Sequence, residues 1–111
     1  MFDNTDNMAR IEREIEKRME AACEKNGWYV AVAMMPPERT TLHIEKFGEE
    51  PVASEDAQAA LDSAVAFAKA EFGTSVEVER FDEKIPNTRA PYHIRLRLKV
   101  DASKRVQELA A

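Results

Sequence analysis

The sequence has few of the residues that build disulfides, phosphate-binding loops and membrane spans. Cys23 is the single cysteine among 111 residues, so the chain cannot form an internal disulfide, and a lone thiol favours a reducing compartment. Three glycines are too few for a glycine-rich phosphate-binding loop. No apolar run approaches the roughly 20 residues of a membrane helix, and the first ten residues lack the apolar core of a secretory signal. These absences predict a cytoplasmic protein that has no membrane partner.

The composition is that of a soluble globular domain whose charge is unevenly distributed. Hydrophobic residues make up 44% and charged residues 33%, and the formal net charge is −5. Residues 1–73 carry 8 basic and 15 acidic side chains, whereas residues 74–111 carry 8 basic and 6 acidic ones. We therefore expect one domain over residues 1–111. Its overall negative field opposes nucleic-acid binding, although its C-terminal third is locally basic.

Two segments have the apolar periodicity of amphipathic helices. In residues 5–26, apolar side chains recur at spacings of three and four, with Cys23 beside the stripe. The stripe consists of Met8, Ile11, Ile15, Met19 and Ala22. Residues 54–72 form the second helix, for which Ser54 is the predicted N-cap and Gly73 the predicted end. Its many alanines predict that it packs close to a sheet.

Four segments have the character of β-strands. Residues 28–35 are a continuous apolar run, which predicts a central strand covered on both faces, and the prolines after it end the strand. Residues 40–47 alternate between apolar and polar side chains and are close enough to form a hairpin with that run. Residues 75–81 and 92–100 alternate in the same way and are separated by a long loop over residues 82–91.

The order of these elements, followed by a short helix after Asp101, predicts the fold class. The sequence indicates an α+β, two-layer sandwich in which a four-stranded, mainly antiparallel sheet carries two main helices on one face. Each half runs helix, glycine, strand, proline-containing loop and strand, with Gly27 and Gly73 in corresponding places. This pattern predicts a pseudo-twofold arrangement of the halves. The element order is similar to that of small acidic secretion chaperones in architecture alone, because no shared motif accompanies the likeness.

The strand over residues 92–100 carries basic side chains on one face of the sheet. Successive strand residues point to opposite faces, so its apolar residues face the core and its basic residues face away. The outward residues are His93, Arg95, Arg97 and Lys99, and the adjacent loop adds Lys84 and Arg89. One hypothesis is that this face binds a nucleic-acid backbone, with Tyr29 as the aromatic residue that can stack on bases.

Two other interpretations explain the same basic strand without nucleic acid. In a hairpin with residues 75–81, Glu77 lies opposite Arg97. In the same register Glu79 lies opposite Arg95, and opposite charges across a strand pair are mildly stabilising. The basic residues then stabilise the sheet. The remaining interpretation is that they form a contact surface for a protein partner.

The two histidines suggest a third kind of chemistry. His43 and His93 are both expected on the outward face, and Glu45 follows His43 by two residues along its strand. Two imidazoles and a carboxylate can bind a metal or transfer protons. However, the sequence has no HExxH or CxxC spacing that is typical of a metal site. The alternative is that both histidines are ordinary surface residues of strands.

Two further segments are candidates for contact with a partner. Met35 and its apolar neighbours precede a loop that two prolines stiffen and that contains Arg39, and methionine adapts to irregular surfaces. Glu49 and Glu50 belong to residues 45–62, which carry six acidic side chains and one basic one. Such a stretch can mimic the phosphates of nucleic acid and occupy a nucleic-acid-binding protein. Some of its acids also suit the start of a helix.

Taken together, these patterns favour a small acidic protein that acts by binding another protein and not by catalysis. No catalytic residue set and no cofactor motif emerges, and the charge asymmetry suits the steering of a protein partner. We expect an adaptor, a chaperone or an inhibitor, such as an anti-defence protein encoded by a phage. Opposite charges on two faces also suit a symmetric dimer. The alternatives are a nucleic-acid-binding module that uses residues 92–100, and a small enzyme or metal site that uses His43, His93 and Glu45.

Overall fold

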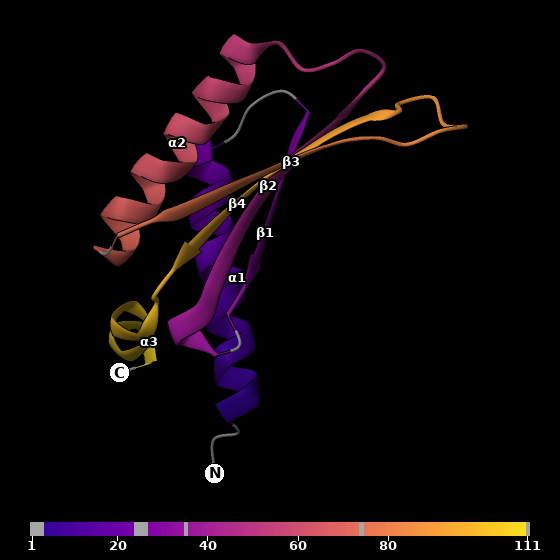
Figure 1. Ribbon diagram of the computed structural model, residues 1–111. Coiled ribbons are helices and arrows are strands. Elements are labelled where there is room, and N and C mark those ends of the chain that lie inside the picture. Colours follow the sequence, from indigo (N-terminus) through magenta and orange to yellow (C-terminus); the bar gives the residue numbers. More distant parts are fainter. Residues whose placement is uncertain (1–3, 24–26, 35, 74, 111) are drawn as a thin grey trace.

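The computed structural model describes residues 4–23, 27–34, 36–73 and 75–110, which form four strands, three α-helices and one short 3₁₀ helix. In chain order the elements are α1 (Asn4–Cys23), β1 (Trp28–Ala33), η1 (Pro37–Arg39), β2 (Thr40–Gly48), α2 (Ser54–Phe72), β3 (Glu77–Lys84), β4 (Tyr92–Val100) and α3 (Ser103–Ala110). This is the order that the sequence predicts (Figure 1). Within the described residues, no helix is both long enough and apolar enough to cross a membrane.

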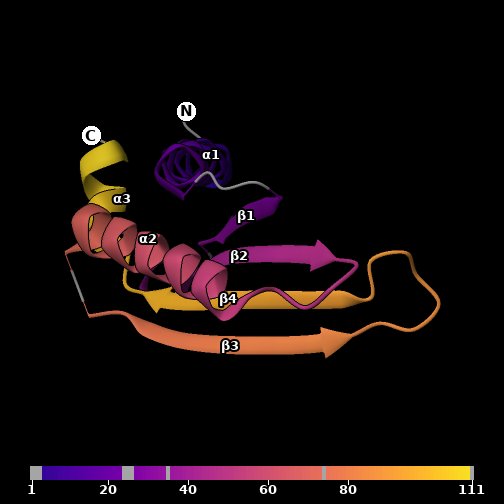
Figure 2. The same ribbon diagram turned by 90° about the horizontal axis from the view of Figure 1, so that it is seen from above.

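The four strands form one antiparallel sheet in the order β1-β2-β4-β3. The second strand of each half is therefore central and the first strand of each half is at an edge, an order that the sequence alone does not determine. Figures 1 and 2 show the helices gathered on one side of the sheet, with the β3–β4 hairpin extending past them. The predicted α+β two-layer sandwich is confirmed.

The structure corrects the prediction that the first strand is central and covered on both faces. β1 is an edge strand, paired only with β2 among the described strands. Val32 is buried against the helices, whereas Tyr29 on the opposite face is 61% exposed. The apolar run misleads because Ala31 and Ala33, which share the outer face with Tyr29, are small enough to tolerate water. Met35, at the end of the predicted strand, lies outside the described residues.

The register of the β3–β4 hairpin also differs from the prediction by two residues. Glu79 lies opposite Arg97 and not Arg95, and Glu77 lies opposite Lys99. β3 continues to Lys84, so the connecting loop covers residues 85–91 and not 82–91. A two-residue shift keeps every side chain on its predicted face, so the alternation of apolar and polar residues cannot distinguish the two registers. The turn decides it, and the Ile85 amide donates a hydrogen bond to the Pro91 carbonyl oxygen over 2.6 Å.

The core lies between the helices and the apolar face of the sheet. On α1 the fully buried side chains are Ile11, Ile15, Met19 and Cys23. Cys23 thus belongs to the buried stripe, whereas Ala22, predicted there, is exposed. On α2 the alanines at 57, 60, 64 and 68 are buried. Because these side chains are small, the helix backbone lies close to the sheet at β4, as predicted.

The C-terminal end of α2 is formed as the sequence predicts, whereas its N-cap residue differs from the prediction. Gly73 adopts a left-handed conformation (φ +64°), and its amide donates a hydrogen bond to the Lys69 carbonyl oxygen. Ser54 is the first helical residue and not the N-cap. The N-cap is Ala53, which forms no side-chain capping bond.

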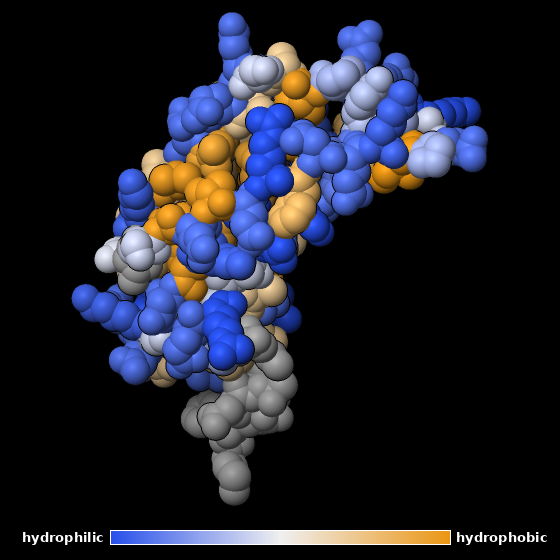
Figure 3. All heavy atoms as spheres, viewed as in Figure 1, coloured by the Kyte–Doolittle hydropathy of each residue, from blue (hydrophilic) through white to orange (hydrophobic). Residues whose placement is uncertain are grey.

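Some apolar residues reach the surface beside α2, as Figure 3 shows. On β3, for example, the side chain of Val78 is 40% exposed.

One flank of α1 carries a row of acidic side chains, Glu12, Glu16 and Glu20, spaced by four residues. Burial, together with repulsion from Glu20 and Glu12, raises the pKa of Glu16. The charged form of Glu16 is therefore less favourable in the folded state than in the unfolded chain. Because its folded pKa is raised, this penalty is complete above the folded pKa and disappears below the unfolded value of 4.5.

We expect Glu16→Gln to stabilise the protein at neutral pH. The substitution removes two like-charge contacts at i,i+4 spacing. This should raise the free energy of unfolding by about 0.5 kcal/mol after solvent screening. Thermal denaturation followed by circular dichroism at pH 7 and at pH 4 measures the effect. The gain in Tm should be present at pH 7 and absent at pH 4, and it should shrink in high salt. A variant that is less stable than the wild type at pH 7 contradicts this account.

Candidate functional site

One face of the sheet is covered by none of the described helices, and we call it the open face. Its residues are those that alternate away from the helices, and the strand registers align them in rows. They are Tyr29, Ala31 and Ala33 on β1, Thr41, His43, Glu45 and Phe47 on β2, His93, Arg95, Arg97 and Lys99 on β4, and Glu77, Glu79, Phe81 and Glu83 on β3. The predicted outward residues of residues 92–100 all lie on this face.

The basic side chains of β4 are partly neutralised by acidic side chains on the neighbouring strands. Lys99 Nζ lies 2.9 Å from Glu79 Oε1, and Arg97 Nε lies 3.4 Å from the same oxygen. The hydrogen bond from Lys99 lowers the pKa of Glu79, and the charge of Arg97 adds to this effect. The predicted cross-strand pairing therefore occurs, with the partners that the corrected register imposes. Four glutamates share the open face with three Lys or Arg residues, so the face is not a basic surface.

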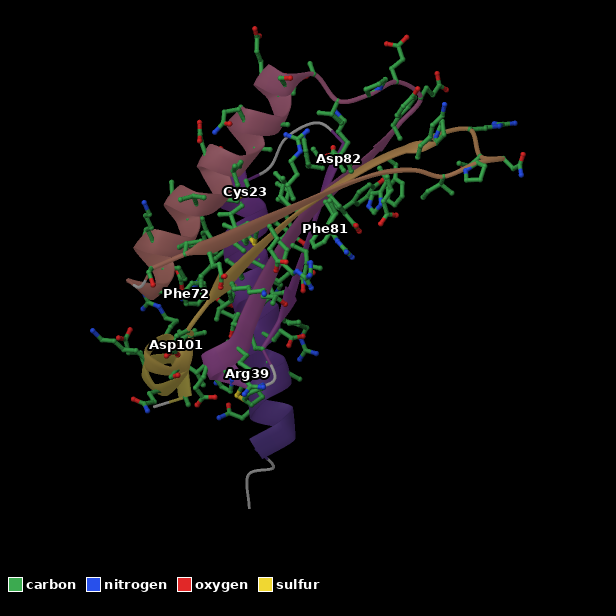
Figure 4. All side chains as sticks on the ribbon, in the orientation of Figure 1. Cys23, Arg39, Phe72, Phe81, Asp82 and Asp101 are labelled. Carbon is green, nitrogen blue, oxygen red and sulfur yellow. The ribbon has the colours of Figure 1, made fainter. Side chains whose placement is uncertain are left out.

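Phe81 holds two arginines at the centre of this face. The guanidinium carbon of Arg95 lies 4.8 Å from the Phe81 ring centroid, and that of Arg97 lies 5.0 Å from it, which is cation–π distance. Figure 4 shows Phe81 on β3, near the middle of the sheet. The Nε atoms of both arginines are buried, and that of Arg97 lies beside the Glu79 carboxylate without completing a hydrogen bond to it. The ring of Phe81 thus orients two neighbouring guanidinium groups on this face.

A second aromatic group adjoins this cluster. The rings of Phe47 and His93 stack in parallel with centroids 4.2 Å apart, and His93 Nε2 lies 2.9 Å from Glu45 Oε2. Phe47 is 43% exposed. Tyr29, which lies on β1 opposite Glu45 of β2, is 61% exposed. Each of the four strands therefore contributes at least one ring to the open face, counting the imidazoles of His43 on β2 and His93 on β4. The rings of Tyr29, Phe47 and Phe81 lie on strands other than the basic one.

The three residues of the suggested metal or acid–base site do not converge. His93 contacts Glu45, whereas His43 Nε2 lies 3.2 Å from the hydroxyl oxygen of Thr41. In the part of the chain that the structure describes, no group of three His, Cys, Asp or Glu side chains is placed to hold a metal ion. Burial lowers the pKa of His43, and the positive charges of Arg95 and Arg97 lower it further.

We expect His43 to make the protein less stable as the pH falls from about 7.5 to about 5.5. Its folded pKa lies below the unfolded value of 6.5, so the unfolded chain binds protons more readily in this range. The stability that neutral His43 provides is present above pH 6.5 and is lost as the pH falls toward the folded pKa. In thermal denaturation, His43→Gln should show a smaller fall in Tm between the two pH values than the wild type. An equal fall in both proteins contradicts the assignment.

The other predicted contact residues lie apart from the centre of the open face. Lys84 lies on the opposite side of β3, with its amine 5.4 Å from the Tyr92 ring centroid, and Arg89 lies in the hairpin loop. Glu49 and Glu50 are exposed between β2 and α2. Of the loop after β1, Met35 lies outside the described residues and Arg39 ends η1.

Arg39 and Lys99 border the same hollow, at the end of the sheet where Figure 4 labels Arg39 and Asp101. They line an open pocket of about 450 Å³ with Glu38, Thr41, Ser75, Glu77, Val100 and Asp101. Two cations and three carboxylates make this pocket mixed in charge. It therefore does not select an anionic or a cationic ligand by charge alone.

Phe47 and Phe81 are the open-face residues that the sequence analysis missed. Both continue the period-two alternation of their strands beyond the positions considered there, since Phe47 follows His43 and Glu45, and Phe81 follows Glu79. The signal was therefore present in the sequence. It was hidden because an aromatic residue at the end of a polar series is easily assigned to the core.

Comparison with known protein families finds no family model that matches this chain, and comparisons with curated proteins and with solved structures find no match either.

Proposed function

We propose that this chain is a protein-binding module that acts by binding and not by catalysis, and that the open face of its sheet is the contact surface. The observation that carries the proposal is the pair of arginines held over Phe81, flanked by the exposed rings of Phe47 and Tyr29. Aromatic residues and arginine are the types most enriched at the energetic centres of protein interfaces. The proposed role is that of an adaptor, a chaperone or an inhibitor, including an inhibitor encoded by a phage. Each of these roles would use the same contact surface.

The rigidity of this surface supports the same function. The arginines are restrained by the ring beneath them, and the Phe47–His93 stack is restrained by the hydrogen bond between His93 and Glu45. Side chains that are already ordered lose less conformational entropy when a partner binds. A partner that offers carboxylates or carbonyl oxygens can pair with the partly exposed guanidinium groups of Arg95 and Arg97.

Nucleic-acid binding is the second candidate, because the rings of Tyr29, Phe47 and Phe81 on one sheet face can stack on bases. Charge favours the protein partner. The cations of β4 share their face with Glu45, Glu77, Glu79 and Glu83, and the whole chain has a net charge of −5. A phosphate backbone approaching this face meets repulsion as well as attraction, whereas a protein partner can complement both signs of charge.

Site-specific photo-crosslinking tests the proposal. A benzophenone amino acid replaces Tyr29 or Phe47, the two most exposed rings of the open face, and Ala66 on the outer side of α2 is the control position. After irradiation in cells of the source organism, adducts are identified by mass spectrometry. We expect one protein to crosslink from both open-face positions and not from the control. Crosslinks that are equally strong at all three positions, or absent from both rings, contradict the proposal.

Two solution measurements separate the remaining alternatives. Fluorescence anisotropy with labelled single- and double-stranded DNA and RNA, at about 50 and 200 mM salt, tests the nucleic-acid candidate, because phosphate-driven binding weakens steeply with salt. If the binding is saturable and salt-sensitive, and if Arg95→Glu abolishes it, nucleic-acid binding replaces protein binding as the proposed function. Sedimentation equilibrium tests whether a second copy of the chain is the partner. A dimer that Phe81→Ala dissociates identifies the open face as a self-association surface.

A further inference from the structure

The two edges of the sheet differ sharply in how they are protected. An edge strand exposes unpaired backbone amides and carbonyls, and proteins normally block such an edge with charged residues. β3 is protected in this way, because Glu77, Glu79, Arg80, Asp82, Glu83 and Lys84 leave only two of its eight residues uncharged. β1, with the sequence WYVAVA, has no charge, no proline and no glycine. This is the composition of a strand that forms backbone pairs on both sides.

A groove runs along the unpaired edge of β1. It has a volume of about 470 Å³ and is lined by Trp28, Tyr29 and Val30 on the strand and by Lys17, Glu20 and Ala21 on α1. Trp28 and Val30 lie on the helix side of the sheet and Tyr29 on the open face, so the groove includes the backbone edge between them. Figure 2 shows α1 lying beyond β1, at the same edge of the sheet. A groove between an edge strand and a helix accommodates one extended chain.

The flank of α1 beside this edge carries the acidic row Glu12, Glu16 and Glu20, of which Glu20 lines the groove together with Lys17. Glu20 lines the groove, and Glu12 reaches the far end of the strand, where its Oε2 accepts a hydrogen bond from the Met34 amide over 3.2 Å. Glu16 lies between them on the same flank of the helix. None of the three forms a salt bridge with a residue in the described part of the chain, whereas Glu14 and Arg18, on the opposite flank, are paired. Among the described residues that line the groove, Lys17 is the one base.

We propose that the edge of β1 binds an extended, basic segment of a protein partner, which adds a fifth strand to the sheet beneath the acidic flank of α1. Backbone hydrogen bonds to β1 supply affinity for an extended chain, and Glu16 and Glu20 select lysine or arginine at alternate positions of that chain. This surface is centred on the edge of β1 and not on the arginine cluster of the open face, although Tyr29 borders both. The variant Phe81→Ala distinguishes the two proposals, because it alters the arginine cluster and leaves the edge of β1 unchanged.

Anisotropy titration with fluorescein-labelled ten-residue peptides tests the proposal on the full chain. The probe alternates valine and lysine and has blocked ends. One control peptide has the same composition with the lysines and valines in two blocks, and a second alternates proline and lysine, which removes half of the backbone donors at unchanged charge. A third alternates valine and glutamate. We expect saturable binding of the valine–lysine probe and at least tenfold weaker binding of all three controls.

Variants and hydrogen exchange locate the site. The double variant Glu16→Lys, Glu20→Lys should weaken binding of the probe at least tenfold, whereas Asp62→Lys, an exposed helical acid on α2, and Phe81→Ala on the open face should change it less than twofold. Amide exchange of β1 should slow when the probe is bound. Equal binding of the block or proline peptides, unchanged exchange of β1, or no binding of the probe overturns the proposal. A dimer that Ala31→Lys dissociates also overturns it, because a second copy then occupies the edge.

Discussion

Phe81→Ala is expected to weaken binding of the protein partner on the order of 30-fold, the effect of losing a residue at the energetic centre of an interface. The substitution affects more than the ring of Phe81 itself. The guanidinium groups of Arg95 and Arg97 lie over that ring, so both arginines lose the surface that orients them. Binding then includes the cost of ordering two long side chains that are ordered beforehand in the wild type. Titration calorimetry with the partner identified by crosslinking measures this loss.

Two controls separate recognition from folding. Phe81→Tyr keeps a ring beneath the arginines and should retain most of the affinity. Ile85→Ala also removes an apolar side chain that is partly exposed, but from the end of the hairpin, and should leave affinity unchanged. If Phe81→Ala binds the partner as tightly as Ile85→Ala does, the arginine cluster is not the centre of the interface.

The alternation of apolar and polar residues was sufficient to predict most of this fold. Residues 92–100 show it without interruption, and β4 covers the predicted range with every side chain on the predicted face. The helices follow in the same way from the spacing of Ile11, Ile15 and Met19 and from the glycine that ends α2. These signals are local, so one segment contains all the information that its own structure requires.

What the sequence could not determine depends on relations between segments. Whether β1 is central or at an edge depends on what packs beside it, and an apolar run is compatible with both. The register of β3 on β4 depends on the turn, because both candidate registers keep Glu79 on the same face. The candidate site depends on that register, since it aligns Phe81 with Arg95 and so assembles the ring and the guanidinium groups.

We expect the largest loss of stability from a substitution at Leu98, which lies in the middle of a row of paired residues on three neighbouring strands. Leu98 is fully buried, and it lies opposite Leu42 on β2 and Val78 on β3. Leu98→Ala leaves a cavity that neighbouring strands cannot fill without breaking their pairing, so we expect a loss of about 3 kcal/mol in the free energy of unfolding. For a domain of this size that corresponds to a fall in Tm of roughly 12–24 °C.

Val78→Ala is the matched control, because Val78 occupies the same row of the sheet but is 40% exposed. Its loss should be about 1 kcal/mol or less, because half-exposed side chains gain less from burial. Urea denaturation followed by circular dichroism measures both variants under the same conditions. If the two substitutions cost the same free energy, Leu98 is not enclosed between the helices and the sheet.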